Sequence, residues 1–328
     1  MTQTMRAAIF EQYGDPFRVA TISRPEPAPG EVLVRIKASG INPLDLKIHE
    51  GAAAHARQPA PAILGLDMTG IVEALGSGVT QFKEGDEVYG MVGGVGGIQG
   101  TLAEFAAVDS DLLAHKPVNI SFREAAVLPL VVITAWEGLV DRMQVKSGQT
   151  LLVQGGGGGV GKAAIQLARH FGADVFATGS ESSRGIIERA GATFIDSGEA
   201  VADYVGRLTG DGFDLAYDTI GGAGLDASFQ AVKKFGHVVS ALGWGTHLLA
   251  PLSFKAASYS GVFTLMPLLT GEGRRHHGEI LREAAQLVEA GELSPNISAE
   301  RFALESAFKA YQAIAGRRSR GKIAVDIG

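Results

Sequence analysis

A run of five glycines, Gly155–Gly159, is the first stretch of this sequence that could do chemistry. It follows the apolar residues Leu151–Val153, which are typical of a short buried strand, and it precedes apolar residues at helical spacing. The free N–H groups in the first turn of a helix, together with the helix dipole, bind anions. Strand, glycine turn and helix in this order predict a phosphate-binding loop and argue against a flexible linker.

The spacing inside this loop fits a dinucleotide. Gly156, Gly158 and Gly161 match the pattern G-x-G-x-x-G. In that pattern the first glycine allows a sharp turn, the second lets a pyrophosphate approach the backbone, and the third lets the helix pack closely on the sheet. We predict that the loop binds a dinucleotide cofactor, with Gly159 and Val160 completing it. Lys162, which follows the last glycine of the pattern, is expected to point to solvent.

Strands and helices alternate around this loop. The predicted strands are 150–153, 174–178, 193–195, 213–217, 236–241 and 261–265. Helical patterns separate most of them, at 160–171, 182–190, 200–208 and 223–232. This order describes a doubly wound parallel sheet.

The rest of the chain has a different pattern. Short strands with frequent turns are predicted at 6–10, 17–21, 31–38, 71–75, 85–92 and 101–108, with Gly40 ending a strand and Asn42–Pro43 starting a turn. Ser121 and Glu124 form a predicted capping box. Helices at 278–290 and 307–315 precede a last strand, 322–327, which we expect to pair with the N-terminal strands. We therefore predict an α/β protein in which residues 1–125 and 268–328 form a β-rich domain, and residues 126–267 form an inserted parallel-sheet domain.

Composition limits the functions that the chain can have. The 328 residues carry a formal net charge of −6, so we expect no binding to nucleic acid or to an anionic membrane. The sequence has no cysteine, which excludes disulfides and thiolate zinc sites. No signal peptide or membrane span is recognisable, and the cytosol is the expected compartment. The eight histidines lie singly or in polar segments, such as His49 in a turn and His276–His277 in a solvated loop, and predict no metal site.

Several motifs occur in the order found in one large family. They are ASGINPLD (38–45), LGLDMTGIV (64–72), GDEVYG (85–90), AAVLPLVVITAWEGL (125–139), the glycine loop, DTIGG (218–222) and GKIAV (321–325). With them the chain resembles the medium-chain dehydrogenase/reductase superfamily over essentially its whole length. The resemblance is to the zinc-independent, quinone oxidoreductase (zeta-crystallin-like) type. It implies a GroES-like catalytic domain, a Rossmann domain and a homodimer.

This resemblance bears on metal use. Zinc-dependent relatives place a Cys where this chain has Asn42 and a His where it has Leu66. A catalytic zinc needs three protein ligands and an open position. We therefore predict a reaction without metal, and a zinc alcohol dehydrogenase is the least favoured alternative.

The cofactor is predicted to be NADPH. The resemblance puts Gly179 where NAD-dependent enzymes carry an acid for the ribose 2′-OH. Ser180 and Arg184 could then bind a 2′-phosphate. Glu181 argues the other way because its carboxylate could face the ribose, and Arg184 could also be an ordinary solvated helix residue.

The resemblance implies hydride transfer to a quinone, with Asn42 and Lys47 lining the pocket where the chemistry occurs. Asn42 could instead only start a turn, and Lys47 could be solvated. The same resemblance implies that other cofactor contacts come from Thr134, Thr219, Leu242 and Gly243. An enone, alkenal or enoyl-thioester reductase is an alternative activity, and a non-catalytic NADPH-binding protein is an alternative of another class.

Overall fold

The structure is a computed structural model that describes residues 3–316 and 321–328. The chain forms two compact units, one of Met1–Leu130 with Leu265–Gly328 and the other of Val131–Thr264. The first unit is β-rich and GroES-like, and the second has the parallel sheet of a Rossmann domain, as predicted. The limits 125/126 and 267/268 remain our proposal for where the functional domains divide, and residues 1–2 and 317–320 of the first lie outside the described residues.

The second unit is built on a six-stranded parallel sheet in the order β11-β10-β9-β12-β13-β14. Its strands are β9 (Thr150–Gln154), β10 (Asp174–Gly179), β11 (Thr193–Asp196), β12 (Phe213–Asp218), β13 (Val232–Ser240) and β14 (Ser258–Gly261). The strand order reverses between β9 and β12, so the crevice in which such sheets bind ligands lies at the carboxyl end of β9. The glycine run follows β9 directly.

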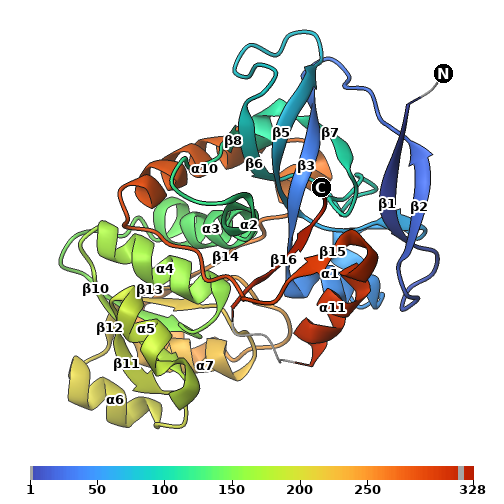
Figure 1. The fold of residues 1–328 in the computed structure, drawn as a ribbon. Coiled ribbons are helices and arrows are strands. Elements are labelled where there is room, and N and C mark those ends of the chain that lie inside the picture. The colour runs from blue at the N-terminus through green and yellow to red at the C-terminus, as the bar shows by residue number, and fades with distance from the viewer. Residues whose placement is uncertain (1–2, 317–320) are drawn as a thin grey trace. The chain divides into compact units, whose positions relative to one another are not determined.

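Helices cover both faces of this sheet. The α-helices of this unit are α3 (Pro129–Trp136, which starts in the first unit), α4 (Gly159–His170), α5 (Arg184–Ala190), α6 (Val201–Leu208), α7 (Ala223–Ala231) and α8 (Ala250–Lys255). In Figure 1, α4 and α5 lie in front of the strands that they contact, β9 to β11, whereas α7 contacts β9, β12 and β13. Because the strand order reverses at β9, the crossovers on its two sides place their helices on opposite faces of the sheet. Leu152, Phe213, Phe229 and Val238 form the buried core between the layers.

The described residues of the first unit form a seven-stranded and a three-stranded sheet. The larger has the path β15-β16-β3-β5-β6-β8, with β7 also paired to β3, and the smaller has the order β2-β1-β4. The strands are β1 (Thr4–Phe10), β2 (Arg18–Ser23), β3 (Glu31–Ile41), β4 (Ala62–Ile63), β5 (Asp67–Leu75), β6 (Glu87–Met91), β7 (Phe105–Asp109), β8 (Leu113–His115), β15 (Phe302–Ala303) and β16 (Ile323–Asp326).

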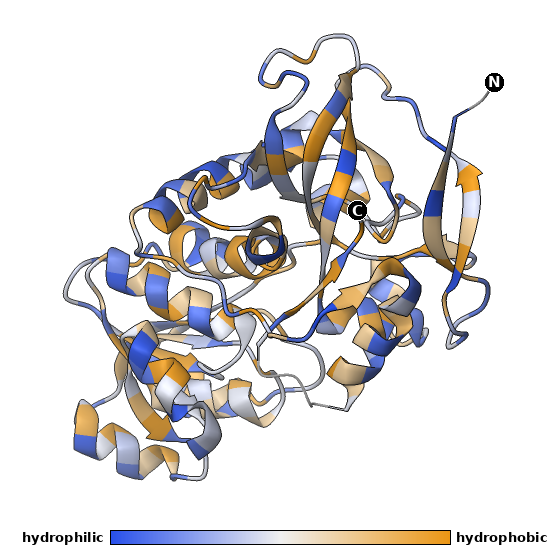
Figure 2. Cartoon of the chain, in the orientation of Figure 1, coloured by the Kyte–Doolittle hydropathy of each residue, from blue (hydrophilic) through white to orange (hydrophobic). Residues whose placement is uncertain are grey.

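The first unit also contains α-helices, several of which contact these sheets. They are α1 (Pro43–His49), α2 (Phe122–Ala126), α9 (Met266–Thr270), α10 (Arg274–Glu289) and α11 (Ala307–Ala315). The predicted capping box begins α2, because Ser121 N–H donates to the Glu124 carboxylate (2.9 Å) and Glu124 N–H to the Ser121 hydroxyl (3.3 Å). Hydrophilic and hydrophobic residues alternate along α10 in Figure 2, which fits its one buried face.

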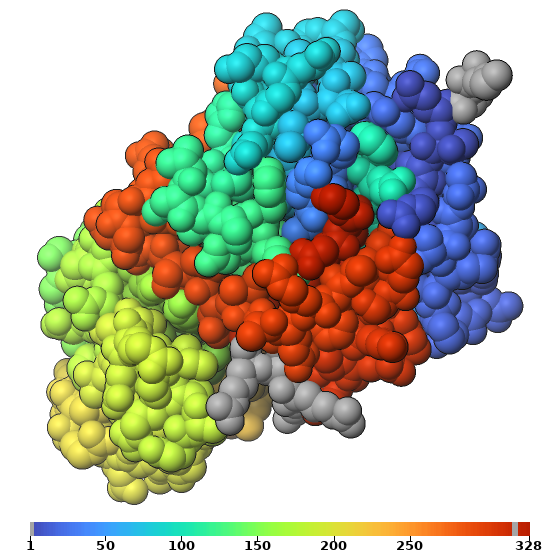
Figure 3. Space-filling model, in the orientation of Figure 1, coloured from blue at the N-terminus to red at the C-terminus, as the bar shows by residue number. Residues whose placement is uncertain are grey.

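The last strand returns to the N-terminal strands as predicted. β16 pairs antiparallel with β3, from Ile323 opposite Ile41 to Asp326 opposite Ala38. Figure 3 shows the red C-terminal residues against blue residues of the N-terminal part on this face. The last strand of the chain and a strand from its N-terminal part therefore belong to one sheet.

The structure differs from the predicted local structure at several positions. The strand does not end at Gly40 but continues to Ile41. Asn42–Pro43 starts the helix α1 and not a turn, because proline is well suited to a first helical position. The last parallel strand is β14, so 262–265 lie beyond it.

The predicted positions of three histidines are also wrong. His276 and His277 belong to α10, where His277 is buried, and are not in a solvated loop. His49 ends α1 and is also buried, among the rings of Phe17, Phe308 and Tyr311.

Candidate functional site

The glycine loop has the geometry of an anion site. Gly158 caps α4 without any side-chain hydrogen bond, so the first turn of this helix keeps N–H groups for a ligand. The loop is fixed to β10, since Gly156 N–H donates to the Thr178 carbonyl oxygen (2.9 Å) and Gly155 N–H to the Thr178 hydroxyl (3.2 Å). Thr178 in turn donates to the Gln154 side chain (2.6 Å). These bonds hold the loop in place before any ligand binds.

The structure assigns the glycines partly different tasks from those expected. The left-handed turn is at Gly155 (φ 82°), one residue before the motif, and not at Gly156. A Cβ on Gly156 would lie 2.6 Å from Ala177 Cβ, and one on Gly161 only 2.2 Å from the Gly155 oxygen. A Cβ on Gly158 would meet only the Gly155 oxygen, at 3.4 Å. Gly156 and Gly161 thus serve packing, while Gly158 leaves open space beside the backbone.

Gly159 and Val160 form the partly exposed first turn of α4, as a phosphate contact requires. Lys162 differs from its prediction. It is half-buried, and this burial lowers the pKa of its ammonium group. The side chain is therefore only partly exposed and does not extend freely into solvent.

The segment after β10 lies against the glycine loop. A Cβ on Gly157 would be 2.5 Å from the Cβ of Ser183, and a Cβ on Gly179 would be 2.5 Å from the Ser183 hydroxyl. An aspartate at position 179 would therefore displace this segment. The predicted 2′-phosphate residues Ser180 and Arg184 are at its two ends, and Arg184 forms an ion pair with Glu181 at 2.7 Å.

Two further predicted residues follow the neighbouring strands. Thr219 comes after β12 and donates its hydroxyl to the Gln154 carbonyl oxygen (2.7 Å). Leu242 and Gly243 come after β13, and a Cβ on Gly243 would lie 2.1 Å from the Tyr259 hydroxyl. The carboxyl ends of adjacent parallel strands thus bring these residues to one edge of the sheet.

Sequence reasoning missed the residue that organises this edge, Asp218. Its buried carboxylate accepts hydrogen bonds from Ser240 Oγ (2.6 Å) and from the N–H groups of Ile220 (3.1 Å) and Gly221 (3.0 Å). Ser240 Oγ also accepts from Leu242 N–H (3.0 Å). One carboxylate therefore shapes both loops. Its position in the DTIGG motif was the available signal.

Thr134 lies in α3 and is buried. Its carbonyl oxygen accepts a hydrogen bond from the Tyr217 hydroxyl (2.6 Å), and its hydroxyl accepts one from Thr264 (3.2 Å). Thr264 alternatively donates to Glu137 (2.8 Å). A hydroxyl network therefore fixes Thr134, and its predicted cofactor contact stays a prediction.

In the first unit, Asn42 is the centre of a buried polar cluster. Its Nδ2 donates to Asp67 Oδ2 (3.0 Å), and its Oδ1 accepts a short hydrogen bond from Lys322 Nζ. Lys322 Nζ is also 3.7 Å from Asp67 Oδ2. The backbone N–H of Asn42 donates to Asp45 Oδ2 (2.7 Å), and Asp67 Oδ1 accepts from the N–H of Leu130 (3.0 Å). Asn42, Asp45, Asp67 and Lys322 are called the Asn42 cluster below.

Burial dominates the electrostatics of the Asn42 cluster. It raises the pKa of Asp45 to about 8 and that of Asp67 to about 6, against the lowering effect of hydrogen bonds and of Lys322. Burial likewise lowers the pKa of Lys322. Asp45 Oδ1 is a buried atom without a hydrogen-bond partner. The sequence motifs NPLD, GLD and GKIAV contained these three residues, but their proximity depends on β16 lying beside β3.

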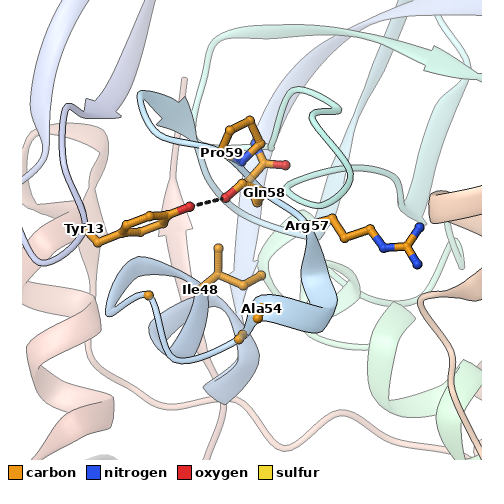
Figure 4. A pocket seen from close by; sticks show the side chains of 8 residues that line it. Tyr13, Ile48, Ala54, Arg57, Gln58 and Pro59 are labelled. Carbon is orange, nitrogen blue, oxygen red and sulfur yellow. Dashed lines mark hydrogen bonds between the residues drawn. The ribbon is translucent and has the colours of Figure 1, made fainter.

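Lys47, the other predicted catalytic residue, is exposed on α1. Together with the larger effect of burial, its positive charge lowers the pKa of His55. Beside α1 lies a pocket of about 320 Å³. It is lined by Tyr13, Ile48, Gly51, Ala53, Ala54, Arg57, Gln58 and Pro59. Figure 4 shows the Tyr13 hydroxyl donating to the Gln58 carbonyl oxygen (2.7 Å). The predicted site residues do not line this pocket.

The structure also bears on metals and membranes. Among residues 3–316 and 321–328, no three His, Cys, Asp or Glu side chains are grouped so that they could hold a metal ion. Leu66, where zinc-dependent relatives have His, is buried. No helix in the same described residues is long and apolar enough to cross a membrane.

The sequence and the fold are similar to those of known proteins. Residues 28–118 match the family model described as alcohol dehydrogenase GroES-like domain, and residues 190–325 match that described as zinc-binding dehydrogenase. The chain is 33% identical to an NADPH-dependent alkenal/one oxidoreductase, chloroplastic, of Arabidopsis thaliana, over 98% of this chain and 79% of that protein. The chain belongs to the medium-chain dehydrogenase/reductase superfamily.

Two further members of the superfamily place the chain within it. It is 28% identical to a quinone oxidoreductase of Homo sapiens, over 97% of both chains. It is 57% identical to an alcohol dehydrogenase superfamily protein from Novosphingobium aromaticivorans, whose crystal structure covers 99% of this chain and 100% of its own with a TM-score of 0.98. These similarities support an oxidoreductase that uses a nicotinamide cofactor.

Proposed function

We propose that this protein is an NADPH-dependent reductase that delivers hydride to an electron-poor conjugated carbonyl compound without a metal. The observation that carries the proposal is the glycine loop at the carboxyl end of β9, beside the reversal of strand order and with the first turn of α4 uncapped. The loop is prebuilt, and Gly158 leaves room for a pyrophosphate.

The residues of the second unit fit such a cofactor. Gly156 to Gly161 would hold the pyrophosphate, and Ser180 with Arg184 the 2′-phosphate. Thr219, Leu242 and Gly243, which surround the carboxyl ends of β12 and β13, would hold the part nearer the nicotinamide. When bound, the nicotinamide supplies the hydride.

The Asn42 cluster is our candidate for the electrophilic side of the reaction. Asn42 has two N–H bonds on Nδ2, and Asp67 takes one of them. Asn42 is fully buried in the structure, so we propose that its second N–H bond donates to the carbonyl oxygen on which negative charge develops once the residues that cover it move aside. Lys322 donates to the carboxamide oxygen of Asn42, and Asp67 accepts from its nitrogen. These two bonds fix the orientation of the carboxamide. Lys47, which is exposed on α1, remains a second candidate for a side chain that contacts the acceptor.

The acceptor is an α,β-unsaturated carbonyl compound or a quinone. An α,β-unsaturated carbonyl comes first because the relative named an alkenal/one oxidoreductase is more similar than the one named a quinone oxidoreductase. This reverses the order of our sequence-based prediction, in which a quinone came first. Both acceptors are already polarised, so hydrogen-bond donors suffice for either. A protein that binds NADPH without turnover remains the third candidate.

One assay separates these candidates. NADPH oxidation is followed by absorbance with a panel of alkenals and enones and a panel of quinones, and is repeated with NADH and after metal removal by a chelator. We expect turnover of enones, preference for NADPH and no loss with the chelator. Turnover of quinones alone would restore the first prediction, and binding without turnover would support the non-catalytic candidate. Loss of activity with the chelator, restored by zinc, would contradict a metal-free reaction.

Homodimerisation and a cytosolic location also remain proposals. β14 is an edge strand of the parallel sheet, with Tyr259 of this strand exposed. An unpaired edge can extend into the sheet of a second copy. Light scattering of the purified protein measures the oligomeric state directly.

A further inference from the structure

The guanidinium group of Arg184 already binds a carboxylate in the structure. Its Nε and Nη2 donate to the two oxygens of Glu181, at 2.7 and 2.8 Å. Its Nη1 is 3.6 Å from Glu188 Oε1, and the guanidinium lies over the ring of Phe194, 4.0 Å from its centroid. Glu181 thus holds one full edge of the guanidinium in a bidentate pair.

A phosphate monoester would bind Arg184 by the same edge. A guanidinium binds carboxylate and phosphate alike through two parallel N–H donors. The ring of Phe194 keeps the guanidinium plane in position, because the charge is attracted to the ring face. Arg184 is suitably placed for a ribose phosphate, because Ser183, the residue before it, lies against Gly157 of the glycine loop.

We propose that Glu181 sets the choice between NADPH and NADH by competing with the 2′-phosphate for Arg184. This inference rests on the proposed function, because it assumes that the glycine loop binds a dinucleotide. When the phosphate is present, the Glu181 carboxylate must leave the guanidinium edge and remains close to a dianion. When the phosphate is absent, the carboxylate can stay paired or accept a hydrogen bond from the ribose 2′-OH. Glu181 therefore weakens NADPH binding and leaves NADH binding unchanged or strengthened.

The competition is modest in size because both side chains are exposed. Glu181 is 68% and Arg184 44% exposed, so water screens the pair. We expect removal of the Glu181 charge to tighten NADPH binding by about threefold to tenfold. The same change is expected to leave NADH binding equal or slightly weaker.

Binding of NADPH and of NADH, followed by the fluorescence of the reduced nicotinamide, tests this inference without requiring turnover. The variant is Glu181→Gln, which keeps size and hydrogen bonding but loses the charge. Asp174→Asn is the matched control, because Asp174 is an exposed acid at the opposite end of β10 from Gly179. We expect the ratio of the NADPH to the NADH dissociation constant to fall with Glu181→Gln and to stay constant with Asp174→Asn.

A double-mutant cycle with Arg184→Gln identifies the mechanism. If Glu181 acts through Arg184, Arg184→Gln weakens NADPH binding, and Glu181→Gln then gives a smaller gain than in the unaltered protein. An unchanged ratio in Glu181→Gln, or an equal change in Asp174→Asn, would overturn the inference while leaving the proposed function intact. If neither cofactor binds the unaltered protein, the proposed function fails and this inference fails with it.

Discussion

At the scale of single residues, the Asn42 cluster combines groups that are each costly to bury. Two carboxylates and one ammonium group lie together, and only Lys322 compensates the negative charge within the cluster. Asp45 also keeps one buried oxygen without a partner. The network fixes the Asn42 side chain, and the cost of doing so should be measurable as a pH-dependent stability.

Asp45→Asn should therefore change how stability depends on pH. Burial raises the pKa of Asp45 from 3.8 to about 8, so the folded protein holds this proton more tightly than the unfolded chain. Stability consequently falls as pH rises from about 4 to about 8, with Asp67 contributing the same sign up to about 6. Asparagine keeps the acceptor for Asn42 N–H but does not titrate. We expect urea unfolding at pH 8 to show the variant more stable, by on the order of 1 kcal/mol or more, with a smaller difference at pH 5.

Asp203→Asn is the control for this experiment, because Asp203 is exposed on α6. It should follow the pH profile of the unaltered protein. A variant Asp45→Asn that is equally destabilised at both pH values would show that Asp45 is ionised in the folded protein and contributes favourably.

Lys322→Met tests the only cation of the Asn42 cluster. The change leaves Asp67, which is fully buried, without its positive partner, and we expect a loss of about 3 kcal/mol in the free energy of unfolding. Lys83→Met is the control, because Lys83 pairs with Asp86 while 84% exposed, and should change stability by less than about 0.5 kcal/mol.

The double variant Asp67→Asn/Lys322→Met removes both charges and should recover part of the loss. If Lys322→Met alone is as stable as the unaltered protein, the buried pair does not support the fold.

At the scale of elements, glycines in helices of the second unit differ in whether the space around them can hold a side chain. Gly161→Ala would place a Cβ 2.2 Å from the Gly155 oxygen, a backbone atom that cannot move without deforming the loop. Gly206→Ala, within α6, would meet no atom within 4 Å. We expect the first change to cost about 2 kcal/mol and to weaken NADPH binding at least tenfold. The second should stabilise by about 0.5 to 1 kcal/mol without affecting binding. Thermal unfolding and cofactor titration of both variants measure this contrast, and equal effects on binding would refute the packing role of Gly161.

The elements also show what sequence could and could not predict. Strong periodicity around the glycine run correctly predicted β9, α4 and the alternation beyond them, because each of these elements buries its own apolar face. The helix α1 was missed because it is short and its apolar residues Leu44, Leu46 and Ile48 alternate with polar ones, which is not a helical spacing. Positive φ at Gly155 was also missed, since every residue nearby is glycine and the pattern does not distinguish them.

At the scale of the whole molecule, the parts that sequence did not predict are those that depend on distant segments. The GKIAV motif was recognisable, but nothing local places Lys322 beside Asn42. That contact exists because β16 pairs with β3 and carries the preceding residues to the start of α1. The ion pair of Arg184 with Glu181 is local by contrast, and both residues were already candidates from sequence.

This organisation predicts that the two units differ in whether they can fold as isolated fragments. All six strands of the parallel sheet and its buried core lie within Val131–Thr264, so no strand of this sheet lacks its neighbours when the segment is isolated. Residues 1–130 alone would lack β15 and β16, which leaves the last residues of β3 without the strand that pairs with them.

We expect the fragment 131–264 to unfold cooperatively on heating, to give dispersed amide NMR signals and to bind NADPH, although more weakly than the whole chain. The fragment 1–130 should give neither a cooperative transition nor dispersed signals, and addition of 265–328 should restore both. A folded fragment 1–130, or an unfolded fragment 131–264, would show that the two compact units are not the units of folding.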